Sequence, residues 1–177
     1  MREFVAVDVG EPAGADRPGA GARPHLTLRF LGEVAPELNG RIAARLEEVA
    51  REVPPFSLRL EGVGAFPSAQ RPRVVWVGVT DGADTVVELA RKVRQALEEL
   101  LGTEREAFVP HLTLFRVRSP RDRDAAVELL RGARPPPPPR DVRVTELLLK
   151  ESVLGPGGAE HRTIAAFPLA GARPAEA

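Results

Sequence analysis

The pentapeptide Pro-His-Leu-Thr-Leu occurs twice in this chain, at residues 24–28 and again at 110–114. The two histidines are 111 − 25 = 86 positions apart in a chain of 177 residues, and self-similarity at so long an offset indicates a duplicated structural unit. Imidazoles suit general acid and general base chemistry near neutral pH, and hydroxyls donate hydrogen bonds to oxyanions such as phosphate. The repeat therefore predicts two His–Thr pairs that work on one phosphate-like group.

Each copy has the pattern of a half-buried β-strand, in which successive side chains point to opposite faces. His25 and Thr27 then share an open face, as do His111 and Thr113, while the leucines face the core. Two such strands brought together would place two imidazoles and two hydroxyls around one cleft. The four side chains are the candidate site.

Strict alternation beyond the motifs gives three further expectations. It predicts that Arg29 lies on the histidine face and that Phe30 lies in the core. It also places Arg116 on the leucine face, opposite His111, unless a bulge after Leu114 changes the alternation.

Two other interpretations of the histidines compete with this one. A single histidine on a strand is most often structural, but the repetition of the whole string, threonine included, argues against that for both copies. A zinc site would need a third ligand, and with no cysteine in the chain only His161 is left to complete a three-histidine site. No metal and no other cofactor is expected.

At these residues the chain resembles the 2H phosphoesterases, a family named for two His-x-Thr-x motifs, and most closely its RNA 2′,3′-cyclic phosphodiesterases, historically called 2′-5′ RNA ligases. The similarity extends over nearly the whole chain. The stretches that carry it include FVAVD, HLTLRFLGE, the pair Phe66-Pro67, PRVVW and PHLTLFRV.

The resemblance implies an α+β fold of two pseudo-symmetric lobes, each an antiparallel sheet with helices, and a cleft between them. It implies metal-free hydrolysis of an RNA 3′-terminal 2′,3′-cyclic phosphate to a 2′-phosphate, with 2′-5′ ligation as a side activity. In the family pattern His25 is the proton donor, His111 the acceptor, and Thr27, Thr113 and Arg116 bind the phosphate. His161 lies where the family often has an aromatic residue near the cleft, and is interpreted as structural or as a weak substrate contact.

Two alternative functions keep the motifs but change their use. The first is the same chemistry on small cyclic nucleotides, ADP-ribose cyclic phosphate or 2′-5′ oligonucleotides. The second is a nucleotide-binding module without turnover, against which the intact histidines and threonines argue. The expected partners are thus RNA 3′ ends or small cyclic-phosphate nucleotides.

Composition limits the remaining possibilities. The absence of cysteine excludes disulfides and thiol nucleophiles and fits a cytoplasmic protein. Zero net charge, from 25 basic and 25 acidic residues, argues against long sequence-independent duplex binding. No stretch has the length of a membrane span or the pattern of a signal peptide, so no membrane partner is expected. We expect a monomer.

The spacing of apolar residues predicts the elements that hold the motifs. Helices are expected over 36–53, 84–101 and from Ser119-Pro120 to Gly132; strands are expected over 2–9, 25–31, 56–63, 73–80, 108–117, 142–150 and 162–169. The strand over 73–80 should be buried on both faces, with Trp76 in the core. Residues 10–24 are predicted to be a loop in place of a helix and short strand found in the family. Residues 1–170 are predicted to form one bilobed domain, followed by a flexible tail over 171–177.

Overall fold

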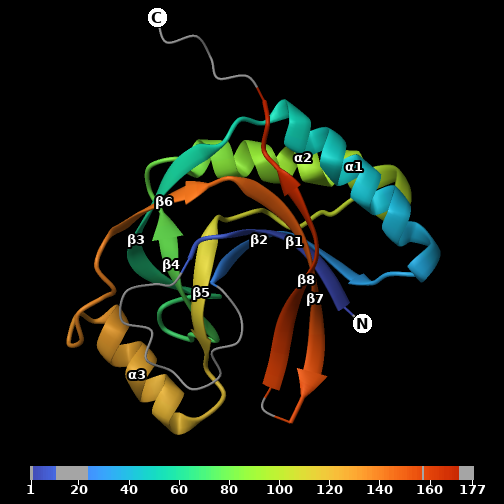
Figure 1. Cartoon of the computed structure of the whole chain (residues 1–177). Helices are drawn as coiled ribbons and strands as arrows, with labels where there is room; N and C mark the ends of the chain where they lie inside the picture. Colours follow the sequence, from blue (N-terminus) through green and yellow to red (C-terminus); the bar gives the residue numbers. More distant parts are fainter. Residues whose placement is uncertain (1, 11–23, 157, 172–177) are drawn as a thin grey trace, which may run out of the picture.

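The computed structural model describes residues 2–10, 24–156 and 158–171, which form two four-stranded antiparallel sheets and three α-helices (Figure 1). The strands are β1 (Arg2–Asp8), β2 (His25–Glu33), β3 (Phe56–Phe66), β4 (Val74–Val79), β5 (His111–Arg116), β6 (Arg140–Val144), β7 (Glu146–Gly155) and β8 (Gly158–Pro168). The helices are α1 (Asn39–Glu52), α2 (Ala83–Leu101) and α3 (Pro120–Leu130), with a short 3₁₀ turn at Pro36–Leu38. The predicted α+β class is confirmed.

Each motif strand lies at the edge of a different sheet. Sheet A has the strand order β2-β1-β7-β8, and sheet B has the order β5-β4-β3-β6. The edge strands β2 and β5 contact each other, so the two copies of the pentapeptide meet where the sheets meet. The motif side chains can therefore face one another where these two edges meet.

The division of the strands between the two sheets does not follow their order along the chain. Sheet A joins the first two strands to the last two, whereas sheet B takes the four in between. The prediction of one strand over 142–150 was therefore wrong: Thr145 separates β6 in sheet B from β7 in sheet A. Apolar residues lie on both sides of this crossing, Val142 and Val144 before it and three leucines after it, so the sequence does not mark where the first strand ends.

Helices α1 and α2 lie side by side across the same side of the strands, and α3 lies apart, near sheet B (Figure 1). Their ends follow local signals. Helix α1 ends before Pro54-Pro55, where proline cannot continue a helix, and α3 begins at the predicted Ser119-Pro120. The Ser119 and Asp122 side chains each accept a backbone N–H there, which forms a capping box.

One hydrophobic core joins both sheets to α1 and α2. Leu26 of β2 and Leu112 of β5, the first leucines of the two motifs, are both in it. The helices contribute their periodic faces; the buried helical residues are Ile42, Leu46, Val49, Ala50, Val86, Leu89, Ala90, Val93 and Leu97. Burial of one leucine side chain contributes about 1.5–3 kcal/mol to the free energy of unfolding. Leu26 and Leu112 therefore anchor the motif strands to the core.

A β-bulge interrupts each motif strand at the same position of the repeat. In sheet A, Ala6 faces Thr27 and Val5 faces Arg29, so Leu28 is the extra residue. In sheet B, Trp76 faces Thr113 and Val75 faces Phe115, which makes Leu114 the extra residue. Because 28 + 86 = 114, the bulge is part of the duplicated unit. A bulge re-aims every side chain after it.

These bulges overturn the alternation beyond the first motif. Arg29 was predicted on the open face but is buried at 4% exposure, and Phe30 was predicted in the core but is 66% exposed. For Arg116 the bulge reverses the face given by strict alternation, and its side chain is exposed and lines the cleft.

Strand β4 was expected to be buried on both faces, which is wrong in part. Val75 and Val77 are buried, but Val74 and Trp76 on the other face are only partly buried. Trp76 therefore lies outside the core and covers Gly64, where a Cβ would come within 2.3 Å of the indole ring. The Trp76 ring also lies beside His111, with ring centroids 6.3 Å apart.

Two predictions fall mainly on residues that the structure does not describe. The predicted loop over 10–24 is described only at its ends, so the expected loss of a helix and strand lies outside the described residues. The same holds for the tail over 171–177, except that the Gly171 N–H donates to the Val53 carbonyl. None of the helices in the described ranges is long and apolar enough to cross a membrane.

Candidate active site

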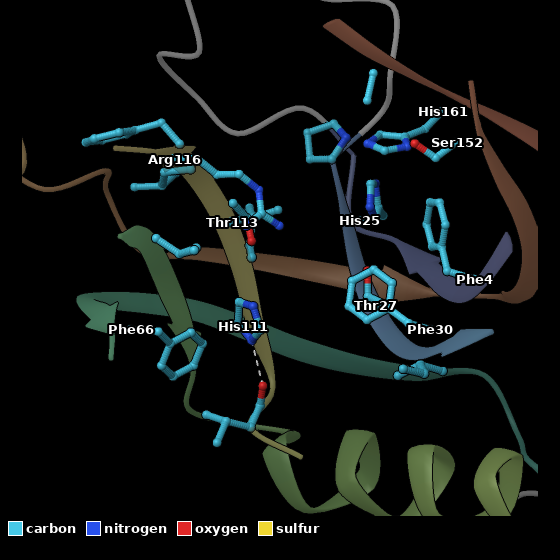
Figure 2. A pocket seen from close by; sticks show the side chains of 18 of the residues that line it. Phe4, His25, Thr27, Phe30, Phe66, His111, Thr113, Arg116, Ser152 and His161 are labelled. Carbon is cyan, nitrogen blue, oxygen red and sulfur yellow. Dashed lines mark hydrogen bonds between the residues drawn. The ribbon is translucent and has the colours of Figure 1, made fainter. Parts of the chain in front are cut away.

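The two motif strands form facing walls of a cleft of about 1800 Å³ (Figure 2). All five site residues predicted from the sequence line it: His25, Thr27, His111, Thr113 and Arg116. In the view of Figure 2, His25 lies across from Thr113, and Thr27 lies nearer His111. This crossed arrangement is the one expected when two like strands are related by a two-fold axis.

His111 is fixed by one hydrogen bond and two aromatic rings. Its Nδ1 lies 2.7 Å from the Val109 carbonyl oxygen, which can only accept, so Nδ1 carries the proton. The Phe66 ring stands perpendicular to the imidazole at 4.9 Å between centroids, and Trp76 tilts against both rings. In the neutral ring, Nε2 is then left with a lone pair, which is the state that a general base requires.

His25 has a different set of neighbours. The rings of Phe4, His25 and His161 form a triangle with centroids 5.1 to 5.2 Å apart, in which His161 stands perpendicular to the other two. Sequence reasoning left His161 as structural or a weak contact and did not single out Phe4. The cross-strand pairing of β1, β7 and β8 brings both rings to the histidine.

An ion pair lies beneath this triangle. Asp8 is the ladder partner of His25, and its carboxylate accepts from Lys150 Nζ at 3.1 Å. Lys150 is only 3% exposed and also reaches the Thr163 hydroxyl at 3.3 Å. A buried ammonium needs such partners to offset its lost hydration. No local sequence pattern indicates this pair, because the two residues are 142 positions apart.

The pKa of His161 is lowered from its ordinary value of 6.5 by burial, by Lys150 and by Arg116. Burial disfavours the charged imidazolium, and the two cations repel it. His161 is therefore neutral near pH 7.

Arg29, turned inward by the bulge, ties the first motif strand to the segment that precedes the second. Its guanidinium donates to the carbonyl oxygens of Arg94 (3.0 Å) and Gly102 (2.7 Å), and Glu104 faces both Arg29 and Arg94. Burial lowers the pKa of Arg29, and Glu104 opposes that shift. Helix α2 and the segment after it thus hold β2 and β5 in a fixed relation.

The described residues contain no group of three or more histidine, cysteine, aspartate or glutamate side chains placed to hold a metal ion. His161, the third ligand of the zinc alternative, packs against His25 through its ring, and its Nδ1 is buried without a hydrogen-bond partner. The donors of this cleft are imidazoles, hydroxyls and a guanidinium, which is a set suited to a phosphate.

Comparison with known proteins agrees with this geometry. The model of the 2′-5′ RNA ligase superfamily matches residues 5–153, which include both motifs. The chain belongs to the 2′-5′ RNA ligase superfamily. The resemblance inferred from the two motifs is thereby confirmed.

Members of this superfamily with similar sequences come from archaea and bacteria. An RNA 2′,3′-cyclic phosphodiesterase of Aeropyrum pernix is 38% identical over 152 residues, covering 79% of this chain and 78% of its own. One of Archaeoglobus fulgidus is 35% identical over 188 residues, covering 94% and 99%.

Solved structures show the same fold. The protein TT0787 of Thermus thermophilus superposes with a TM-score of 0.74 at 30% identity, covering 98% of this chain and 100% of its own. E. coli LigT complexed with 3′-AMP gives 0.68 at 27% identity, covering 96% and 98%. The predicted fold class, two antiparallel sheets with helices, is confirmed by these neighbours.

Proposed function

We propose that this protein hydrolyses the 2′,3′-cyclic phosphate at an RNA 3′ end to a 2′-phosphate, with His111 as general base and His25 as general acid. The observation that carries the proposal is the meeting of the two His–Thr pairs, from edge strands of two sheets, in one cleft. The names of the similar proteins support the reaction and the RNA substrate.

The reaction balances with these groups alone. His111 Nε2 takes a proton from water as the water oxygen attacks phosphorus. The bond from phosphorus to O3′ breaks, and O3′ takes a proton from His25, which leaves a 2′-phosphate monoester and a free 3′-hydroxyl. The Thr27 and Thr113 hydroxyls and the Arg116 guanidinium hold the non-bridging oxygens as negative charge grows on them. Proton exchange with solvent then restores both histidines.

The hydrogen bond of His111 supports this division of roles. Because Nδ1–H is donated to Val109, the neutral ring presents a proton acceptor to the cleft. In ligation, a 5′-hydroxyl would take the place of water and form a 2′-5′ bond with the same groups.

The deciding experiment is a turnover assay on an oligoribonucleotide that ends in a 2′,3′-cyclic phosphate, with the product identified by ³¹P NMR. We expect a 2′-phosphate, and losses of at least ~10²-fold for His25→Ala and for His111→Ala. Parallel assays on 2′,3′-cyclic mononucleotides and on ADP-ribose cyclic phosphate test the small-molecule alternative. Tight binding without product formation would instead indicate a nucleotide-binding module.

Two further arms test the phosphate contacts and the metal-free chemistry. Thr27→Val and Thr113→Val keep the shape but remove the hydroxyl, and should cost ~1–3 kcal/mol of transition-state binding. Thr85→Val, at an exposed position of helix α2, is the matched control and should leave turnover unchanged. EDTA should also have no effect; activity lost in EDTA and restored by zinc or manganese would overturn the metal-free mechanism.

A further inference from the structure

Two imidazoles lie side by side on the wall of the cleft that sheet A forms. The ring centroids of His25 and His161 are 5.1 Å apart, and both residues line the cleft (Figure 2). Because like charges this close repel each other, a proton on one ring disfavours a proton on the other. The proposed reaction requires the proton on His25, so a proton held by His161 would oppose it.

Asp8 is placed beside His25. The two residues are ladder partners on β1 and β2, and the Cβ atoms of such a pair lie about 4.5–5.5 Å apart. His161 belongs to β8, which β7 separates from β1, and its ladder partner is the uncharged Ser152. The carboxylate therefore favours a proton on His25 over one on His161, because the attraction between opposite charges falls with distance.

Lys150 disfavours a proton on His161. Its Nζ is fixed by two partners, the Asp8 carboxylate at 3.1 Å and the Thr163 hydroxyl at 3.3 Å, and the residue is only 3% exposed. Burial lowers the pKa of His161 from 6.5, and the positive charges of Lys150 and Arg116 lower it further. The contacts agree with this direction, since in the described part of the chain His161 Nδ1 is buried without a hydrogen-bond partner. An imidazolium would leave an N–H unpaired there.

We propose that the Asp8–Lys150 ion pair directs the single proton of the two imidazoles to His25. This assignment rests on the function proposed above for its catalytic consequence. The carboxylate attracts the proton at His25 while the ammonium repels it from His161, so the wall presents one defined acid to the O3′ leaving group. Asp8 and Lys150 are positioning residues, because neither is among the described residues that line the cleft.

Other charged or titratable groups near the two rings do not replace Asp8. The cations among them disfavour an imidazolium on either ring. Glu160 precedes His161 on β8, but it pairs with Arg162 at 3.6 Å and does not line the cleft. These groups are Arg2 on β1, Glu160 and Arg162 on β8, and His111 and Arg116 on β5.

The test follows the imidazole signals by NMR between about pH 5 and 9. With only three histidines in the chain, His25→Ala and His161→Phe identify two of the signals. In the wild-type protein, the signal of His25 should titrate at higher pH than that of His161. Asp8→Asn should lower the titration midpoint of His25 by about one pH unit or more, because the ring loses a neighbouring opposite charge.

Lys150→Met removes the ammonium and keeps a long apolar side chain, and it should raise the titration midpoint of His161. The Asp8 side chain is 26% exposed, so its carboxylate stays hydrated in this variant, which serves as the test if the unpaired ammonium of Asp8→Asn prevents folding. Asp141→Asn is the matched control and should move neither midpoint, because Asp141 pairs with Arg59 on sheet B.

Two results would overturn the proposal. The first is a wild-type His161 that titrates at higher pH than His25. The second is a pair of titration midpoints that stay unchanged in every folded variant of Asp8 and Lys150.

The rate profile connects this proton to catalysis. In Asp8→Asn, the alkaline limb of kcat/KM should move to lower pH by the same interval as the His25 midpoint, and the acidic limb should stay in place. An ion pair with a purely structural role would lower stability without moving either limb, which would contradict the proposal. If the wild-type protein turned over none of the cyclic-phosphate substrates, the proposed function would fail, and the NMR titrations would still decide which imidazole holds the proton.

Discussion

The two proposed catalytic histidines have unlike surroundings. Around His111, the contacts are the aromatic rings of Phe66 and Trp76 and a backbone carbonyl, none of which titrates. Around His25, the neighbours include a second imidazole and the Asp8–Lys150 ion pair. The motifs are identical in sequence, so the difference between the proposed acid and base arises from residues outside them.

The paired mechanism predicts a bell-shaped pH dependence of kcat/KM. The base must be neutral while the acid is protonated, so the rate falls on both sides of an optimum. The two limbs belong to the pair as a coupled system.

Single mutants assign the limbs of this profile. Measured on residual activity, His111→Ala should lose the acidic limb and His25→Ala the alkaline limb. Persistence of the full bell in both variants would place the titrating groups elsewhere.

His161 gives a separate pH effect, on stability. Its native pKa lies below the unfolded value of 6.5, so at pH below about 6.5 the unfolded chain binds more protons than the folded one. The stability that His161 contributes is therefore fully present above pH 6.5 and is lost as the pH falls toward the native pKa. The charged groups facing the ring, Lys150 and Arg116, act in the same direction as burial.

The prediction is tested by urea unfolding between pH 5 and 8. The His161→Phe variant, which keeps an aromatic ring against His25, should lose stability less steeply than the wild-type protein below pH 6.5. With only three histidines in the chain, the imidazole signals can also be followed individually by NMR. Identical slopes in the two proteins would contradict a neutral, half-buried His161.

At the scale of elements, the bulges mark how far the sequence could predict the structure. The alternation that placed His25, Thr27 and the leucines holds up to Leu28. It fails beyond, because a single extra residue moves Phe30 to the cleft and Arg29 to the interior. Which residue of the strand is left unpaired depends on the partner strand and on the carbonyl oxygens of Arg94 and Gly102, which accept hydrogen bonds from Arg29. Neither is visible in a local pattern of apolar residues.

The Arg29–Glu104 contact gives a prediction at the same scale. Glu104→Gln removes the carboxylate that faces two guanidiniums, Arg29 and Arg94, and should destabilise the fold by about 1–3 kcal/mol. Because this contact joins β2 to the segment before β5, kcat should fall together with stability.

Glu99→Gln is the matched control for this variant. Glu99 pairs with Arg45 on the exposed surface, where an ion pair contributes little, so the variant should change neither stability nor kcat. A Glu104→Gln protein with wild-type stability would show that the buried arginine does not need its partner.

At the scale of the whole molecule, the two sheets share one core. Leu97 of α2 is fully buried in this core, which includes residues of both sheets. Leu97→Ala should cost about 2–5 kcal/mol and lower the stability of both sheets together.

Two probes can follow the sheets separately during urea unfolding. Trp76, the single tryptophan, reports on sheet B, and the NMR signals of His25 and His161 report on sheet A. Coincident transitions, shifted equally by the mutation, are expected. Separate midpoints would show that the lobes unfold independently.

The pairing of the first two strands with the last two also determines when the molecule can assemble during synthesis. Domains generally begin to fold as the chain emerges from the ribosome, N-terminal parts first. Here β1 can pair with β2 early, but its other edge has no partner until β7, some 140 residues later, has been made. The strands of sheet B are complete by Val144. We infer that the strands of the wall with His111 can pair on the nascent chain, whereas the wall with His25 is finished only after β7 and β8 have been made.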